Sequence, residues 1–123
     1  MIWPIKTTAE FDEWFADLDE DGQVEVIATV ELLKHLGPRL GRPHADTLKG
    51  SRHANMKELR ASIADAVLRI AFAFDPERAG ILLVAGNKTG VSQKRFYKQL
   101  IARADELYDA HLANLKARRK GKG

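Results

Sequence analysis

Residues 56–89 constrain the fold of this chain most, because three short apolar runs occur there with turn signals between them. Residues 56–61 alternate between two faces, residues 67–74 are aliphatic and aromatic apart from Arg69, and residues 81–85 are aliphatic. Short apolar runs that are bounded by turn residues are typical of neighbouring β-strands. The stretch therefore predicts a three-stranded antiparallel meander.

A helical hairpin is predicted before the meander. Thr7 or Thr8 caps the first helix, and a turn at residues 19–22 leads into the second. The second helix is expected at residues 23–36, and Gly37 ends it. Apolar residues at spacings of three and four predict the buried faces of this hairpin, which are Phe11, Trp14, Phe15, Leu18, Val26, Ile27, Val30, Leu33 and Leu36.

The remaining segments complete an α+β domain. Residues 2–6 are expected to form a strand, which Pro4 restricts to the sheet edge or to a bulge. After the meander, Ser92 caps a last helix with a buried apolar face and a basic start. We expect one domain at residues 1–115, with a small antiparallel sheet of the N-terminal strand and the meander packed by the hairpin and the C-terminal helix. Residues 116–123 are expected to form a basic flexible tail.

Composition and charge limit the function classes. The chain has no cysteine, no recognisable signal peptide and no apolar run near the roughly 18 residues of a membrane span, so a cytoplasmic protein without membrane association is expected. Residues 1–37 hold two basic and nine acidic residues, a net charge of −7, whereas residues 38–123 hold eighteen and eight, a net charge of +10. This segregation favours a surface for a polyanion; acidic helix faces in solvent with a basic tail are the alternative.

Residues 38–55 form a basic loop of a length that is unusual without a role. It carries four cations against one acid, Asp46; the cations are Arg39, Arg42, Lys49 and Arg52. The plainer interpretation is a basic surface connection that docks through Leu40 and Leu48.

Three cations and one acid are expected on one side of the meander. Glu58 and Arg60 share a strand face, antiparallel pairing can bring Arg69 beside Arg60, and Lys88 follows the third strand. Arginine grips phosphate oxygens with two donors, and clustered cations stabilise the extra charge of a pentacovalent phosphorane. For a single arginine, a salt bridge to a helix acid is the simpler interpretation; for the set, we favour a phosphate site.

Two other catalytic motifs are excluded. The segment AGNKTG is not a P-loop, because five residues separate Gly80 from Gly86 where four are required. The four histidines, His35, His44, His53 and His111, show no metal-ligand spacing. Nucleotide hydrolysis and a histidine metal site are therefore not expected.

The element order and several segments resemble the RelE superfamily of bacterial toxins, and most closely its HigB-like, phage-derived branch. The segments are LKGSRHANMKELRA, VLRIAFAFDPERAGILLVAGNKT and the basic start of the next helix. The motif positions are Leu48-Lys49-Gly50, Glu58-Leu59-Arg60, Arg69 with Phe72, and residues 81–88. The resemblance covers residues 2–112 and implies a RelE-like α+β fold.

The resemblance implies an mRNA interferase that cuts mRNA, usually in the ribosomal A site, and is neutralised by a cognate antitoxin. The RNA 2′-hydroxyl attacks the adjacent phosphorus, without a metal or cofactor. Arg60 and Arg69 would hold the scissile phosphate, and Lys88 would assist the transition state or the leaving group. Residues expected to contact RNA are Lys49, Arg52, His53, Lys57, Lys94, Arg95 and Tyr97.

The general base of this reaction is inferred from the residues themselves. Glu58 is the nearby carboxylate on the strand face of Arg60, which makes it the candidate general base. The aromatic expected near Arg69 is Phe72, and Tyr97 can reach into the site or stack on a base.

Two other functions remain open from the sequence. The first is a non-catalytic RNA- or ribosome-binding domain that uses the same basic face, with salt-sensitive binding and no cleavage. The second is an interaction protein whose acidic hairpin binds a partner chain. The expected partners are mRNA, the ribosome and an antitoxin, which we expect to be a helix-turn-helix protein.

Overall fold

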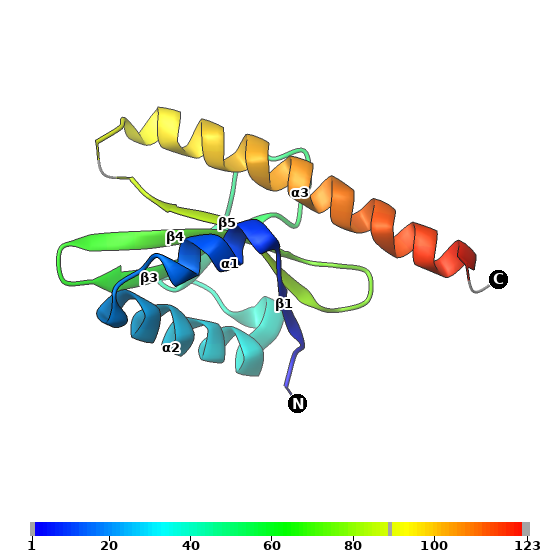
Figure 1. Ribbon diagram of the computed structural model, residues 1–123, viewed down its shortest axis with the longest axis horizontal. Helices are drawn as coiled ribbons and strands as arrows, with labels where there is room; N and C mark the ends of the chain where they lie inside the picture. The colour runs from blue at the N-terminus through cyan, green and yellow to red at the C-terminus, as the bar shows by residue number, and fades with distance from the viewer. Residues whose placement is uncertain (1, 89, 122–123) are drawn as a thin grey trace.

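The computed structural model describes residues 2–88 and 90–121. Figure 1 shows a sheet that lies between α3 on one side and α1 with α2 on the other. The elements in chain order are β1 (Ile5–Thr7), α1 (Ala9–Ala16), α2 (Glu20–Leu36), the short 3₁₀ helix η1 (Gly37–Arg39), β2 (Ala45–Thr47), β3 (Lys57–Ile63), β4 (Ala66–Phe74), β5 (Gly80–Asn87) and α3 (Gln93–Gly121). Thr89, within the predicted meander stretch, lies outside the described residues.

The five strands form one sheet in the order β1-β5-β4-β3-β2. The predicted meander is confirmed, since β3 pairs antiparallel with β4 and β4 with β5. The edge position of the first strand is also confirmed, although its residues are 5–7 and it runs parallel to β5. The sheet is therefore mixed, and the expectation of a purely antiparallel sheet was wrong at this edge.

The predicted loop at residues 38–55 contains a strand that sequence patterns missed. β2 pairs antiparallel with β3, with Asp46 opposite Glu58. A strand of three residues carries little pattern of its own, and its partner strand supplies the hydrogen bonds that define it. This pairing places Asp46 at the edge of the sheet.

Helix capping explains where α1 and α2 begin. Thr8 caps α1, and its Oγ1 accepts from the Phe11 amide at 3.0 Å. The predicted turn at residues 19–22 is wrong, because the Asp19 side chain caps α2 by accepting from the Gly22 amide at 2.8 Å. Acidic residues in the first helical turn also favour the positive end of the helix dipole, so α2 starts at Glu20.

The buried face of α2 differs in part from the prediction. Val26 and Leu33 are buried as expected, but Ile27 and Leu36 are exposed. Thr29 is buried in their place, because its hydroxyl donates to the Glu25 carbonyl within the helix at 2.8 Å. Satisfying that hydroxyl internally removes the cost of burying it.

Apolar residues fill the space on both sides of the sheet. Leu59, Phe72 and Leu82 face the hairpin, whereas Ala71, Ala73 and Leu83 face α3. The basic segment predicted as a tail at residues 116–123 is helical as far as Gly121, and residues 122–123 lie outside the described residues. No helix within residues 2–88 and 90–121 combines the length and apolarity that crossing a bilayer requires.

Asp75 organises the turn between β4 and β5 and ties it to α3. One carboxylate oxygen accepts from the amides of Glu77 and Ala79 at 2.9 and 3.0 Å, and the other pairs with His111 Nε2 at 2.7 Å. Burial opposes the charge, but the hydrogen bonds of His111, Ala79 and Glu77 outweigh it and lower the pKa of Asp75 below its ordinary 3.8.

We expect Asp75→Asn to destabilise the chain by about 2 kcal/mol at neutral pH, because it replaces a buried charged acceptor. A lowered pKa in the folded state contributes stability above pH 3.8 that is lost as the pH falls below this value. Urea unfolding of both proteins at pH 7 and pH 3 should therefore show a smaller difference at pH 3. An equal difference at both pH values would contradict this role.

Candidate functional site

A row of residues crosses three strands beneath the start of α3. Arg60 on β3 lies opposite Arg69 on β4, and Arg69 lies opposite Gly86 on β5. A Cβ atom at Gly86 would come within 3.1 Å of a ring carbon of Phe96. The glycine thus lets the first turns of α3 approach the sheet, which brings Tyr97 to the two arginines.

Glu58 connects three side chains, those of Arg60, Arg69 and Tyr97, and these four residues are here named the Glu58 cluster. Glu58 Oε2 accepts from Arg60 Nη2 at 2.9 Å, and Oε1 accepts from the Tyr97 hydroxyl at 2.8 Å. Arg69 Nε donates to the Tyr97 hydroxyl at 2.6 Å and lies 3.5 Å from Glu58 Oε1. The predicted juxtaposition of the two arginines with Glu58 is therefore present.

The side chains of the Glu58 cluster differ in how far they are exposed to solvent. The side chain of Glu58 is 5% exposed, whereas those of Arg60 and Arg69 are 29% and 18% exposed. Burial disfavours the charge of Arg60, but the hydrogen bond and charge of Glu58 outweigh it, so the pKa of Arg60 is raised. A buried carboxylate thus holds two cations whose outer surfaces reach solvent.

Burial raises the pKa of Tyr97 to about 12, and the hydrogen bond and charge of Glu58 act in the same direction. The folded state therefore favours the neutral phenol, and this contribution to stability is lost as the pH rises from about 10 towards 12. We expect the ultraviolet titration difference between wild type and Tyr97→Phe to have its midpoint above pH 11 (about one unit above the ordinary tyrosine value). The variant keeps Tyr108 as its one tyrosine. A midpoint near pH 10 would contradict the buried hydrogen bond.

Arg69 also lines a pocket of about 270 Å³ beside the turn between β3 and β4. Lys88 lines the same pocket, and its Nζ donates to Gln93 Oε1 at 3.3 Å. The hydrogen bond of Arg69 to Tyr97 and its ion pair with Glu58 both involve Nε. Because Arg69 and Lys88 both line this pocket, an anion there would lie between two cations.

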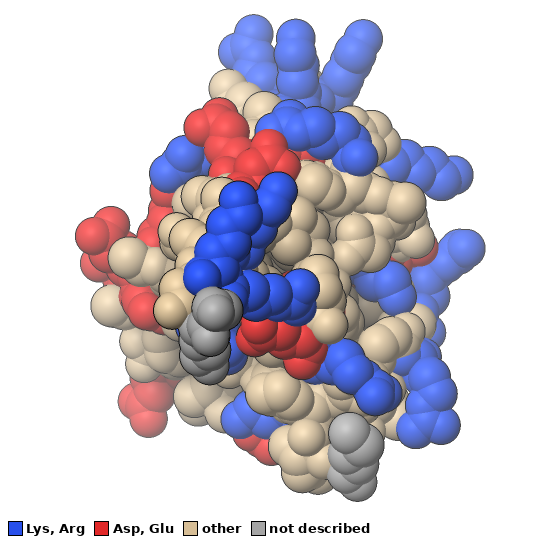
Figure 2. Space-filling view, turned by 90° about the vertical axis from the view of Figure 1, so that its right-hand side faces the viewer, with Lys and Arg blue, Asp and Glu red and all other residues tan. Residues whose placement is uncertain are grey.

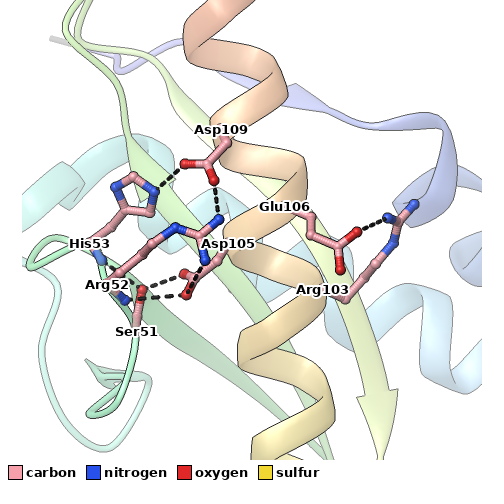
Figure 3. A network of polar contacts seen from close by, with 7 residues as sticks. All are labelled: Ser51, Arg52, His53, Arg103, Asp105, Glu106 and Asp109. Carbon is pink, nitrogen blue, oxygen red and sulfur yellow. Dashed lines mark hydrogen bonds and ion pairs between the residues drawn. The ribbon is translucent and has the colours of Figure 1, made fainter.

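Two of the predicted RNA-contact residues, Arg52 and His53, lie in the loop before β3 and contact a later part of α3, as Figure 3 shows. His53 Nε2 lies 2.7 Å from an Asp109 oxygen, and Arg52 pairs with Asp109 and with the buried Asp105. Ser51 Oγ also donates to Asp105, at 2.5 Å. These contacts fasten the basic loop to α3 more than two turns beyond Tyr97, so the structure does not bring Arg52 and His53 into the Glu58 cluster.

The other predicted RNA contacts are divided between two sides. The side chain of Lys57 lies on the face of the sheet opposite to that of Glu58, and its Nζ donates to the Pro38 carbonyl at 3.2 Å. Lys49 is exposed in the loop, and Lys94 and Arg95 are exposed in the first turn of α3, the helix that carries Tyr97. On the face in Figure 2, most acidic side chains lie to the left, and Lys and Arg side chains project from the top, centre and right.

The structure changes two details of the site. Phe72 does not lie near Arg69, because it packs in the core on the hairpin side of the sheet, and Tyr97 is the aromatic that Arg69 contacts, with the guanidinium carbon 5.7 Å from the ring centre. Sequence reasoning also missed Asp46, whose Oδ2 lies 3.6 Å from Arg60 Nη2 and 3.6 Å from Arg42 Nε. Its signal was a lone acid among four cations in the loop.

Two of the four histidines pair with aspartates. In the part of the chain that the structure describes, no three His, Asp or Glu side chains gather as metal ligands. His53 and His111 each pair with one aspartate of the packing around α3. These two histidines thus join segments of the fold.

Comparison with known sequences gives a family and two close relatives. Residues 13–109 match the profile of the family described as phage derived protein Gp49-like (DUF891). HigB2 of Mycobacterium tuberculosis (strain ATCC 25618 / H37Rv) is 45% identical over 116 residues, which cover 89% of this chain and 57% of HigB2, so the chain spans little more than half of that relative. HigB3 of the same organism is 42% identical over 105 residues, which cover 85% of this chain and 90% of HigB3.

Two solved structures share the fold at low sequence identity. The archaeal RelE–RelB complex from Pyrococcus horikoshii OT3 gives a TM-score of 0.55 at 13% identity and covers 74% of this chain and 100% of that chain. A mutant of the E. coli toxin RelE in the free state gives 0.57 at 9% identity, with 83% and 96% covered. The fold is thus RelE-like, as expected. The chain therefore belongs to the phage-derived Gp49-like family, is HigB-like in sequence and has a RelE-like fold.

Proposed function

We propose that this chain is the toxin of a type II toxin–antitoxin system and acts as an mRNA interferase, an endoribonuclease that needs no metal. The observation that carries the proposal is the pairing of Arg60 with Arg69 across β3 and β4, both held by one buried carboxylate. Such an arrangement presents two preorganised cations on one face, which suits the charge that develops on a phosphate under attack. The family membership supports the same function.

The scissile phosphate binds between Arg60 and Arg69 in this proposal, with Lys88 at the far side of the Arg69 pocket. The two Nη groups of Arg69 can hold two phosphate oxygens in a bidentate grip. The 2′-hydroxyl attacks the adjacent phosphorus, the bond from phosphorus to the 5′ oxygen breaks, and the ammonium of Lys88 gives that oxygen a proton. The products are a 2′,3′-cyclic phosphate and a 5′-hydroxyl.

We assign Glu58 to orienting this site. Both its oxygens are engaged by Arg60 and Tyr97, and its side chain is 5% exposed, so a substrate hydroxyl reaches it only if one of these contacts breaks. A general base must come within about 3 Å of the proton that it removes. The role of Glu58 as general base, predicted from the sequence, is less favoured by this geometry than an orienting role.

Tyr97 and the basic residues of the first α3 turn have a proposed role in RNA binding. Tyr97 is partly exposed beside Arg69, where an unpaired base can stack on it. Lys94 and Arg95 lie in the same helix start and supply charge for the backbone. We propose weaker, more distant contacts to RNA for Lys49, Arg52, His53 and Lys57, which lie outside the Glu58 cluster.

The proposed setting is the bacterial cytoplasm, with mRNA on the ribosome as substrate. One structural relative is a RelE–RelB complex, which supports a protein antitoxin as partner of this chain as well. We propose a helix-turn-helix protein for this antitoxin. The domain proposed for these activities spans residues 1–115.

Induction of the chain in a bacterial host, with growth followed and RNA 5′ ends mapped, tests the proposal. We expect growth arrest and new 5′ ends inside translated frames. The second candidate is a binding domain that uses the same cations, which are equally suited to a phosphate backbone that is held and not cut. Arrest with salt-sensitive ribosome binding and no new ends would favour that candidate. A folded chain that causes neither arrest nor cleavage would contradict both.

A further inference from the structure

We propose that Asp46 is the carboxylate that accepts the proton of the RNA 2′-hydroxyl. This inference rests on the proposed ribonuclease function and deepens it, because it names a base that neither the motifs nor the predicted loop revealed. It follows from where β2 places Asp46 relative to Arg60, and from how the two carboxylates of this region differ in access.

Asp46 lies on the same side of the sheet as the Glu58 cluster. It stands directly opposite Glu58 in the β2–β3 ladder, and side chains that are opposite each other in a ladder share a face. Arg60 lies between the two carboxylates, 2.9 Å from Glu58 Oε2 and 3.6 Å from Asp46 Oδ2 through the same Nη2. A phosphate held by Arg60 is therefore next to Asp46 on the edge side of the sheet.

The two carboxylates differ in what their oxygens can reach. Glu58 is 5% exposed and engaged at both oxygens, whereas the side chain of Asp46 is 34% exposed. Asp46 Oδ1 accepts from the Thr47 amide at 2.9 Å, which fixes the carboxylate. The contacts of Oδ2 with Arg42 and Arg60 are ion pairs at 3.6 Å, longer than hydrogen bonds, so this oxygen can accept a proton from a substrate.

Charged side chains face Asp46 from its own segment and from the neighbouring strand. Arg42 faces it from the segment before β2, and Glu58 and Arg60 face it from β3. Two cations and one anion thus surround the carboxylate, and Glu58 is itself paired with Arg60. A phosphate that binds Arg60 in place of this ion pair would leave Asp46 free to take the hydroxyl proton.

Asp46 Oδ2 takes the 2′-hydroxyl proton while the 2′ oxygen forms a bond to phosphorus. The bond from phosphorus to the 5′ oxygen breaks with its electron pair, and this oxygen takes a proton from Lys88. Exchange with water then returns Asp46 to its carboxylate and Lys88 to its ammonium form.

Single-turnover cleavage of a synthetic RNA, free and on ribosomes programmed with it, tests this role as a function of pH. We expect Asp46→Asn to lower the rate by about 100-fold or more while RNA affinity and unfolding temperature stay close to wild type. Asp46→His should recover part of the rate, with an acidic limb near pH 6.5, the ordinary pKa of histidine. A residue that merely holds Arg60 would not move the pH profile. Asp17→Asn, an exposed acid at the end of α1, is the matched control.

The outcomes separate this inference from the function on which it rests. Wild-type chain that cuts neither substrate would overturn the proposed function, and the inference with it. Active wild type with an Asp46→Asn rate within about twofold would overturn the inference alone, as would an Asp46→His profile that matches that of Asp46→Asn. Loss of rate together with loss of RNA affinity would assign Asp46 to holding Arg60 and would also overturn the inference.

Discussion

Arg69→Ala should abolish growth arrest and lower RNA cleavage by about 10³-fold, while the chain remains folded. Arg69 connects the Glu58 cluster with the pocket that Lys88 lines, because its Nε contacts Tyr97 and its side chain lines that pocket. The variant loses the bidentate grip on the phosphate. Glu58 keeps Arg60 as its counter-ion, so we expect a stability loss of only about 1 kcal/mol.

Two further variants sharpen this result. Arg69→Lys keeps the charge without the planar fork and should restore part of the rate. Arg78→Ala is the matched control. Arg78 lies in the β4–β5 turn, with its guanidinium over the ring of Trp3, and is not part of the Glu58 cluster. Growth curves and 5′-end maps give the readout. Undiminished toxicity of Arg69→Ala would remove Arg69 from the site.

Glu58→Ala is expected to have the largest effect on stability. It leaves Arg60 and Arg69 without their common counter-ion and Tyr97 without its acceptor. Removing one partner of a buried pair costs about 3 to 5 kcal/mol, and the partial exposure of the arginines reduces this to about 2 to 3 kcal/mol. The melting temperature should fall by about 10 °C, and cleavage should be lost with the arrangement of the arginines.

Glu58→Gln separates the two effects. The amide keeps the shape and one acceptor oxygen, so it should lose less stability than Glu58→Ala, while the arginines lose their shared charge. Thermal unfolding with cleavage assays on the two variants gives the comparison. An unfolding temperature for Glu58→Ala equal to that of wild type would mean that the carboxylate does not hold the cluster together.

The meander and its arginines could be predicted because their signals are local. Alternation along residues 56–61 places Glu58 and Arg60 on one face, and the short turn before β4 brings Arg69 opposite Arg60. Two-residue periodicity thus predicted both the strand face and the partner across the ladder. The threonine that caps α1 was also recognisable, because a helix cap is a local signal in the sequence.

What the sequence did not predict depends on contacts between distant segments. β2 exists through its pairing with β3, so Asp46 looked like a loop residue. Tyr97 reaches Arg69 because Gly86 lets α3 approach the sheet, whereas Phe72 turns to the other face. Arg52 was expected to face RNA, but Asp105 and Asp109 on α3 engage it, and nothing in the spacing of these residues predicts that pairing.

We propose that this chain cuts RNA by 2′-hydroxyl attack at the paired arginines. The most direct measurement is the chemistry of the RNA ends that purified chain produces on ribosomes programmed with a defined message. We expect 2′,3′-cyclic phosphate and 5′-hydroxyl ends, and no cleavage when the nucleotide 5′ of the cut carries a 2′-deoxy sugar. Ends with a 3′-hydroxyl and a 5′-phosphate, or cleavage that survives the 2′-deoxy substitution, would contradict it.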